Sequence, residues 1–341
     1  MAKPTTRRQA LKRIGTAGAG LILTRGLIRG QTEDIRIAGR QVEIAVSTLS
    51  PTTVRVTVLP LEGESGAGFP VDGAIGPEGE GRSPTRRRAR ERFEPVPAGN
   101  LVVKFTADPP TLHVETREGR PVQRFTLDAA GPGISFLLGR APLLGLGQGG
   151  PQFDRKGATD SMRSGQVGYK LRTHGGRVPI QWLVGTEGWA IFLHHPLGSF
   201  DFTGPEGKFA PAGDSLPLDI FVVSSPDPAV IMREYARITG LAEMPPLWSL
   251  GYMQSHRTLA GADEVRAVAR TMREKKLPCD ALIYLGTDFT PSGWNTHNGE
   301  FTWKSGNFPD PKDLIDELHR RQYKVVLHIV IEGRRLTGTV K

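Results

Sequence analysis

The hydrophobic pattern of this 341-residue chain changes at about residue 226, and this change limits the folds that the chain can adopt. Before that point, short alternating or apolar runs rich in Val, Ile, Phe and Thr stand between glycines and prolines, a pattern typical of β-strands. The clearest runs are residues 42–48, 53–59, 101–106, 112–115, 189–194 and 218–223. Many strands without a helical period favour two packed sheets, so we predict a β-sandwich over residues 32–240.

Beyond this region, helical and strand-like segments alternate. A connecting helix is predicted over residues 226–239, and further helices after Asp263 and Pro309, because apolar residues there recur with a period of about 3.6. Apolar runs predict strands at residues 248–254, 281–285 and 324–331. Strand–helix–strand order implies parallel pairing with the helices as crossovers. From the residues alone, such a sheet begins either a doubly wound fold or a (β/α)8 barrel.

The first 31 residues predict an export signal. A basic start containing the adjacent Arg7 and Arg8 precedes a weakly apolar run at residues 14–24, a pattern similar to a twin-arginine signal. The alternative is a disordered basic tail. We therefore expect a periplasmic or extracellular protein. No later apolar stretch reaches about 18 residues, so no membrane contact is expected beyond the signal.

The net charge of +9 raises the possibility of nucleic-acid binding, most of all through the basic run at residues 82–92. Acidic residues interleave with this run and no aromatic platform accompanies it, so a solvated loop is the preferred interpretation and no nucleic-acid partner is expected. The single cysteine, Cys279, precedes an apolar run and is expected to be a buried thiol. No Cys/His group has metal-ligand spacing, so neither a metal nor a cofactor is expected.

Four motifs follow one another along the chain. They are Leu144-Gly145-Leu146-Gly147-Gln148 with Phe153-Asp154-Arg155-Lys156-Gly157, then Pro179-Ile180-Gln181-Trp182, then Pro245-Pro246-Leu247-Trp248-Ser249-Leu250-Gly251-Tyr252, and last Phe308-Pro309-Asp310-Pro311 followed by Leu314-Ile315-Asp316-Glu317-Leu318-His319. In this order they resemble glycoside hydrolase family 31, the retaining α-glucosidases and α-xylosidases. The resemblance covers roughly residues 97–341.

The resemblance implies an α+β multidomain protein. A galactose-mutarotase-like β-sandwich at residues 32–240 would precede the first strands and helices of a (β/α)8 TIM barrel at residues 241–341, with the barrel incomplete. Sugar would bind at the carboxyl ends of the barrel strands. The family's nucleophile lies on strand four and its acid/base further on, so both are expected beyond Lys341 and no catalytic residue is expected within these residues.

Six residues are candidate sugar contacts on the basis of this resemblance and of their place at strand ends or in a neighbouring loop: Asp288, Glu332, Trp294, His256, Arg257 and Arg155. Four of them have an alternative role. Asp288 could cap a loop, Glu332 could pair with the arginines that follow it, and Trp294 could be an exposed loop aromatic instead of a stacking platform for sugar. Arg155 could fix a turn together with its neighbour Asp154.

Three of these positions depart from the family's pattern. After the second barrel strand, the family places two carboxylates one residue apart, whereas here Gly286 takes the first place and Asp288 the second. After the first strand, His256 and Arg257 stand where an arginine and an aromatic residue are usual. After the third strand, Glu332 follows Val330-Ile331, where Asp-Pro is usual.

We therefore predict a retaining α-glycoside hydrolase of carbohydrate metabolism whose nucleophile and acid/base lie outside these residues, and whose partner is an α-linked glycoside. The alternative is a non-catalytic carbohydrate-binding or interaction fragment. A coding sequence that continues downstream with a Trp-x-Asp nucleophile motif would favour the first of these.

Overall fold

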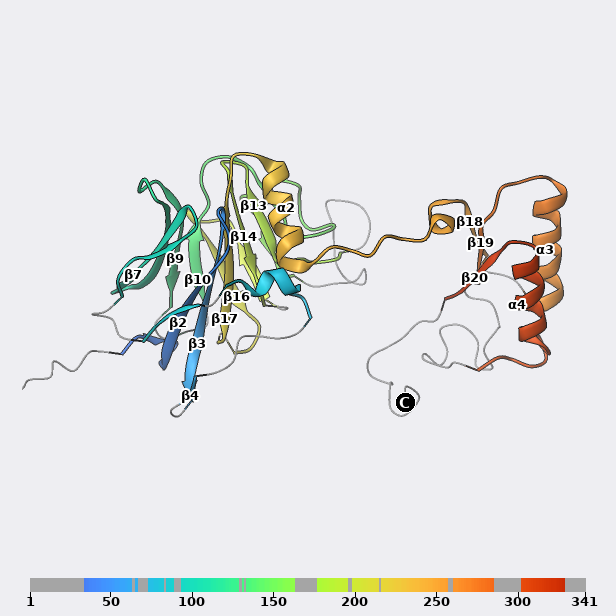
Figure 1. Cartoon of the computed structure of the whole chain (residues 1–341), viewed down its shortest axis with the longest axis horizontal. Coiled ribbons are helices and arrows are strands. Elements are labelled where there is room, and N and C mark those ends of the chain that lie inside the picture. Colours follow the sequence, from blue (N-terminus) through green and yellow to red (C-terminus); the bar gives the residue numbers. More distant parts are fainter. Residues whose placement is uncertain are drawn as a thin grey trace, which may run out of the picture. The chain divides into compact units, whose positions relative to one another are not determined.

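The computed structural model describes residues 34–62, 65–66, 73–82, 84–88, 93–128, 131, 133–162, 177–195, 198–214, 216–256, 260–284 and 302–328. The chain divides into two compact units, Met1–Leu241 and Ala242–Lys341. Figure 1 shows the elements of both. The predicted export signal lies outside the described residues. Within them, no helix has the length and apolar character needed to cross a membrane.

The first unit contains two antiparallel sheets. Among the described residues, the first sheet follows the order β1-β2-β3-β17-β14-β13-β11, with β4 paired to β3 and β5 paired to β2. Its strands are β1 (Arg36–Ile37), β2 (Arg40–Ser50), β3 (Thr53–Glu62), β4 (Ser65–Gly66), β5 (Thr85–Arg87), β11 (Leu143–Gly145), β13 (Trp182–Gly185), β14 (Trp189–Leu193) and β17 (Leu218–Ser224).

The second sheet follows the order β12-β15-β16-β10-β9-β8-β7-β6. Its strands are β6 (Val96–Ala98), β7 (Leu101–Ala107), β8 (Pro110–Thr116), β9 (Pro121–Leu127), β10 (Ile134–Leu137), β12 (Thr159–Asp160), β15 (Gly198–Asp201) and β16 (Glu206–Pro211). All six runs that alternation marked as strands are strands in the structure, which confirms this part of the sequence prediction.

One hydrophobic core joins the two sheets. Val56 and Ile220 of the first sheet belong to the same buried cluster as Phe125, Phe136 and Phe209 of the second. Strand β17 is buried along nearly its whole length because both of its faces are covered. Its even-numbered apolar residues join the core between the sheets, whereas Phe221 and Val223 face a smaller cluster on the other side.

Helix α2 (Pro228–Thr239) covers that other side and runs beside β13 and β14 (Figure 1). It begins at Pro228, two residues after the predicted start, because the Asp227 side chain caps it by accepting a hydrogen bond from the backbone N–H of Ala229 at 2.8 Å. Ile231 and Ile238 then pack against the aromatic residues of the sheet. A short 3-10 helix, η1 (Pro77–Glu80), lies against its carboxyl end, where the backbone N–H of Gly76 donates to the carbonyl of Ile238.

A buried carboxylate links three strands of the first sheet. Arg55 of β3 donates to both oxygens of Asp219 in β17, from Nε at 2.9 Å and from Nη2 at 2.7 Å. Thr57 and His194 Nδ1 also contact this carboxylate. Burial raises the pKa of Asp219, but hydrogen bonds from His194 and Arg55 outweigh it and hold the pKa below its ordinary value. The pair is therefore ionised at neutral pH.

The second unit contains a parallel sheet with the order β18-β19-β20 among the described residues. Its elements are η3 (Leu247–Leu250), β18 (Met253–His256), α3 (Ala262–Glu274), β19 (Ala281–Tyr284), α4 (Pro311–Arg320) and β20 (Lys324–Leu327). Both strand pairs are parallel, with α3 and α4 as the crossovers. This agrees with the predicted strand–helix–strand order.

The strand predicted over residues 248–254 is wrong in its first half. Pro246 precedes a 3-10 turn, in which the backbone N–H of Ser249 donates to the Pro246 carbonyl at 2.9 Å and the Ser249 hydroxyl donates to the same oxygen. The strand begins only at Met253. Trp248, the first residue of the predicted strand, is half-buried in this turn. Two prolines before an apolar run favour a turn over immediate sheet pairing.

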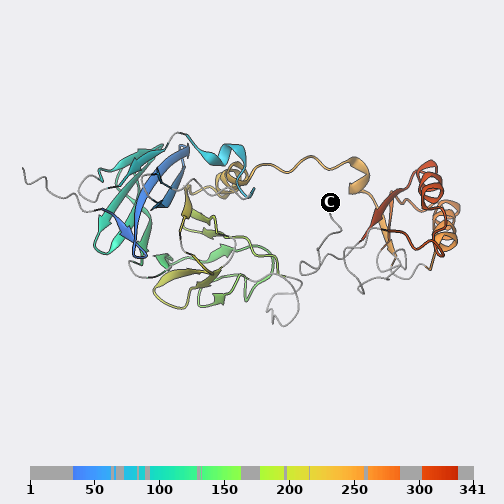
Figure 2. The same ribbon diagram turned by 90° about the horizontal axis from the view of Figure 1, so that it is seen from below.

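Helices α3 and α4 lie side by side on one face of the parallel sheet (Figures 1 and 2). The core beneath them contains Val265 and Ala269 of α3, Leu314 and Leu318 of α4, and Leu282 of β19. Cys279 joins this core as a buried free thiol, as the sequence predicted.

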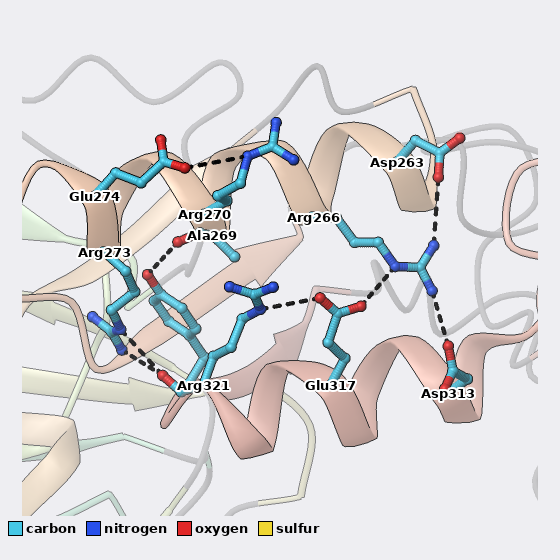
Figure 3. Close-up of polar contacts among 10 residues, drawn as sticks. Asp263, Arg266, Ala269, Arg270, Arg273, Glu274, Asp313, Glu317 and Arg321 are labelled. Atoms are coloured by element: carbon cyan, nitrogen blue, oxygen red, sulfur yellow. Dashed lines mark hydrogen bonds and ion pairs between the residues drawn. The ribbon is translucent and has the colours of Figure 1, made fainter.

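Charged side chains connect the exposed sides of these helices, as Figure 3 shows. Arg266 of α3 donates to Glu317 at 2.8 Å and to Asp313 at 3.1 Å, both on α4. Glu317 also accepts from Arg321 at 3.0 Å. The hydrogen bond from Arg266 lowers the pKa of Glu317. Near the other end of α3, Arg273 lies over the ring of Tyr323 and donates to the Arg321 carbonyl.

Replacement of Asp219 by alanine is expected to destabilise the first unit by about 3–5 kcal/mol, because it leaves the buried guanidinium of Arg55 without its counter-charge. Urea denaturation of the full chain, followed by tryptophan fluorescence, measures this loss. The matched control is Asp214→Ala, whose carboxylate is two-thirds exposed and pairs with Arg40. The control is expected to cost less than about 1 kcal/mol. Equal losses in the two variants would contradict this account.

Replacement of Glu317 by alanine is expected to destabilise the second unit by about 1 kcal/mol, since one carboxylate serves two arginines from two helices. Hydrogen exchange of α4 amides measures the effect, which should shrink at high salt. Glu274→Ala is the control, because among the described residues this carboxylate pairs within α3, with Arg270 at 3.6 Å. Exchange in α4 that accelerates equally in both variants would show that the bridge between the helices contributes nothing.

Candidate functional site

The carboxyl ends of the three parallel strands form the candidate site. His256, Tyr284 and Leu327 are aligned across β18, β19 and β20, so the three strands end at one edge of the sheet. The backbone N–H of His328 continues this alignment by donating to the Tyr284 carbonyl at 3.0 Å. The loops that follow the strands at this edge start close together. Barrel enzymes with parallel strands form their ligand sites from such loops.

His256 is the one sequence-predicted residue that the structure describes at this edge. It is the last residue of β18 and its side chain is partly exposed. A histidine there can donate to or accept from a sugar hydroxyl through its ring nitrogens. Its position at the edge is therefore compatible with the predicted contact.

Four of the other predicted contacts lie outside the described residues. These are Arg257, Asp288, Trp294 and Glu332. In sequence, Arg257 follows β18, Asp288 and Trp294 follow β19, and Glu332 follows β20. Their assignment as sugar contacts stays a prediction.

Tyr284 was not among the residues that the sequence singled out. Its side chain packs in the core under α3 and α4, with its ring stacked on Phe308 at 6.4 Å between centroids. Within the described part of the chain, its buried hydroxyl has no hydrogen-bond partner. Burial raises the pKa of Tyr284 far above its ordinary value, so the phenol stays neutral. The only signal in the sequence is a tyrosine that ends an apolar strand.

Arg155 is not placed as a sugar contact. Its side chain is buried, with 4% exposed, in the loop between β11 and β12. The guanidinium donates to the backbone carbonyl of Gly145 at the end of β11 and to those of Gly149 and Gln152 in the loop, at 2.6–3.1 Å. These contacts use its donors to hold the loop and leave the group out of solvent. The alternative role, that of fixing a turn, is the one that the geometry supports.

A second buried arginine completes this loop and was missed by the sequence reasoning. Arg177 donates to the carbonyls of Leu146 and Gln148 and forms an ion pair with Asp160 at 2.7 Å. The side chains of Arg177 and Asp160 are both fully buried. An arginine in a glycine-rich stretch is usually exposed, so no sequence pattern predicted that Arg177 would be buried against this loop.

Part of the chain matches a family model. Residues 242–334 match the TIM-barrel domain of glycosyl hydrolases family 31. The matched segment contains the three parallel strands and the two crossover helices found among the described residues of the second unit.

Characterised relatives point to the same family. The chain is 28% identical over 154 residues to an alpha-xylosidase of Saccharolobus solfataricus. This alignment covers 45% of the chain and 20% of the relative. The chain is also 32% identical over 128 residues to alpha-glucosidase 2 of Bacillus thermoamyloliquefaciens. That alignment covers 38% of the chain and 16% of the relative. These alignments therefore span about a fifth or less of each relative's length.

Solved structures show the same fold over most of the chain. A family 31 dextranase of Flavobacterium johnsoniae in complex with glucose superposes with a TM-score of 0.64 at 19% identity, covering 84% of this chain and 36% of the dextranase. A family 31 alpha-xylosidase from a soil metagenome in complex with xylose gives a TM-score of 0.62 at 18% identity, covering 86% and 45%. The family model over residues 242–334, the names of the relatives and the shared fold all show that this chain is similar to glycoside hydrolase family 31.

Proposed function

We propose that this chain supplies the β-sandwich and the first part of the (β/α)8 catalytic barrel of a retaining α-glycoside hydrolase. One observation carries the proposal. The segment that matches the family's barrel domain coincides with a parallel sheet whose strands are joined by two crossover helices. Parallel pairing brings the carboxyl ends of β18, β19 and β20 to one edge, where barrel enzymes bind their substrates.

The proposed reaction is a double displacement at the anomeric carbon. One carboxylate attacks this carbon while a carboxylic acid protonates the departing glycosidic oxygen, which gives a covalent glycosyl–enzyme intermediate. The second group, now a carboxylate, removes a proton from water, which attacks the same carbon and releases the sugar with its configuration retained. We place both carboxylates on barrel segments beyond Lys341, and we propose that the present residues contribute sugar contacts.

His256 is the proposed contact that the structure describes, with Asp288, Trp294, Arg257 and Glu332 as further candidates from the sequence. The substrate class is an α-linked glucoside or xyloside, which the names of the relatives support. We further propose export through the twin-arginine-like segment at the amino terminus.

The test compares the 341-residue chain with the longest product of its locus, using p-nitrophenyl α-D-glucopyranoside and α-D-xylopyranoside. The longer product is expected to turn over one of the two at about 1 s⁻¹ or faster, a usual range for enzymes, and the 341-residue chain to release no p-nitrophenol above background. Proton NMR of the first-formed sugar should show the α-anomer. If the native product ends at Lys341 and binds oligosaccharide without cleaving it, the non-catalytic alternative replaces this proposal.

In the longer product, His256→Ala is expected to raise KM for the preferred glycoside about tenfold, the equivalent of one lost hydrogen bond to a sugar hydroxyl. His113→Ala is the control, because His113 belongs to β8 of the first unit. Its KM should match that of the unmodified enzyme. Steady-state kinetics measures both variants, and unchanged kinetics in His256→Ala would remove this residue from the sugar site.

A further inference from the structure

A hollow of about 530 Å3 lies on the outer face of the second sheet, in the first unit. Strands β8, β9, β10 and β16 contribute to its wall, together with the turn before β8. Its polar lining consists of Asp108, Thr126, Asp128, Ser135 and Lys208. Pro109 and Pro110 supply an apolar wall at one end.

The strand register explains why a hollow forms there. Lys208 is aligned with Ser135, Ser135 with Thr126, and Thr126 with Thr111, so a single row of side chains crosses four neighbouring strands. The flanking residues Leu127, Ile134 and Phe209 point into the core between the sheets, which turns this row outward. The surface is hollowed at the middle of this row because the side chains of Ser135 and Thr126 are shorter than those around them.

The polar side chains of the hollow form fewer hydrogen bonds and ion pairs than the charged side chains on the rest of this face. Outside the hollow, charged residues pair across strands, as Lys104 does with Glu115 and Arg124 with Glu206. Among the described residues, the side chains of Asp108, Ser135 and Lys208 make no hydrogen bond or ion pair within 4 Å, although Lys208 is aligned with Asp201 on the neighbouring strand β15. Hydroxyl, carboxylate and ammonium groups thus stand together with unused hydrogen-bonding capacity.

We propose that this hollow, the hydroxyl groove, binds a short neutral oligosaccharide. Four strands spaced about 4.8 Å apart give a groove of roughly 14 Å, the length of two to three pyranose rings. Sugar hydroxyls both donate and accept, which matches a lining of hydroxyls with one ammonium and carboxylates nearby. The proline wall suits the apolar C–H side of a ring. The choice of a carbohydrate ligand rests on the proposed function, whereas the groove itself does not.

Titration of the full 341-residue chain with isomaltotriose and maltotriose, followed by saturation-transfer NMR and calorimetry, tests the proposal. We expect a dissociation constant of about 1 mM for at least one of the two, a usual strength for a few hydrogen bonds on an open surface. Thr126→Val keeps the shape of the side chain and removes its hydroxyl, and Ser135→Ala removes the other. Each is expected to weaken binding about fivefold to tenfold.

Thr106→Val is the matched control, because Thr106 is exposed on β7 of the same sheet and does not line the groove. Its binding should equal that of the unmodified chain, and equal melting temperatures in all variants exclude a folding effect. The proposal is overturned if neither trisaccharide binds at roughly 20 mM, or if the groove variants bind as tightly as the control. Because this readout is binding alone, it can succeed or fail independently of the hydrolysis assay.

Discussion

The carboxylate of Asp219 is a buried charge that links three strands of the first sheet. It binds Arg55 and Thr57 of β3 and His194 at the end of β14, so three strands share one buried charge. The same guanidinium reaches the carbonyl of Glu80 in η1, and η1 in turn packs its backbone on the end of α2. The ion pair thus reaches α2 only indirectly, whereas α2 itself contacts the sheet through Ile231 and Ile238 and through Glu234, which accepts a hydrogen bond from Thr53 at 2.7 Å.

The second unit is held in another way. Its core is smaller, and the two helices are also joined from outside by Arg266, Glu317 and Arg321 (Figure 3). Such exposed charges contribute little singly and more as a network. The residues of this network, Arg266, Glu317 and Arg321, are not among the residues proposed to contact sugar.

The sequence predicted elements better than it predicted side-chain roles. Alternation and 3.6-residue periodicity located the strands and helices because burial of one face imposes those periods. They failed at residues 248–252, where a proline-led turn overrides an apolar run. Arg155 was expected on a sugar and is instead inside a loop, and Arg177 was not noticed. Whether an arginine is buried depends on carbonyls brought together by tertiary structure, which no local pattern records. The hydroxyl groove was equally hidden, because its row of side chains exists only once four strands are in register.

The loop clamped by these two arginines has a further consequence for variation. A Cβ added at Gly145 or Gly147 would lie 2.3 or 2.1 Å from a backbone carbonyl oxygen, and one at Gly150 would lie 2.2 Å from the Arg155 guanidinium. Phe153, in contrast, is 78% exposed. The glycines of this loop therefore do not tolerate side chains, whereas position 153 does. A library of variants directed at position 153 should fold, whereas a library that also varies the glycines should contain mostly variants in which the loop cannot form.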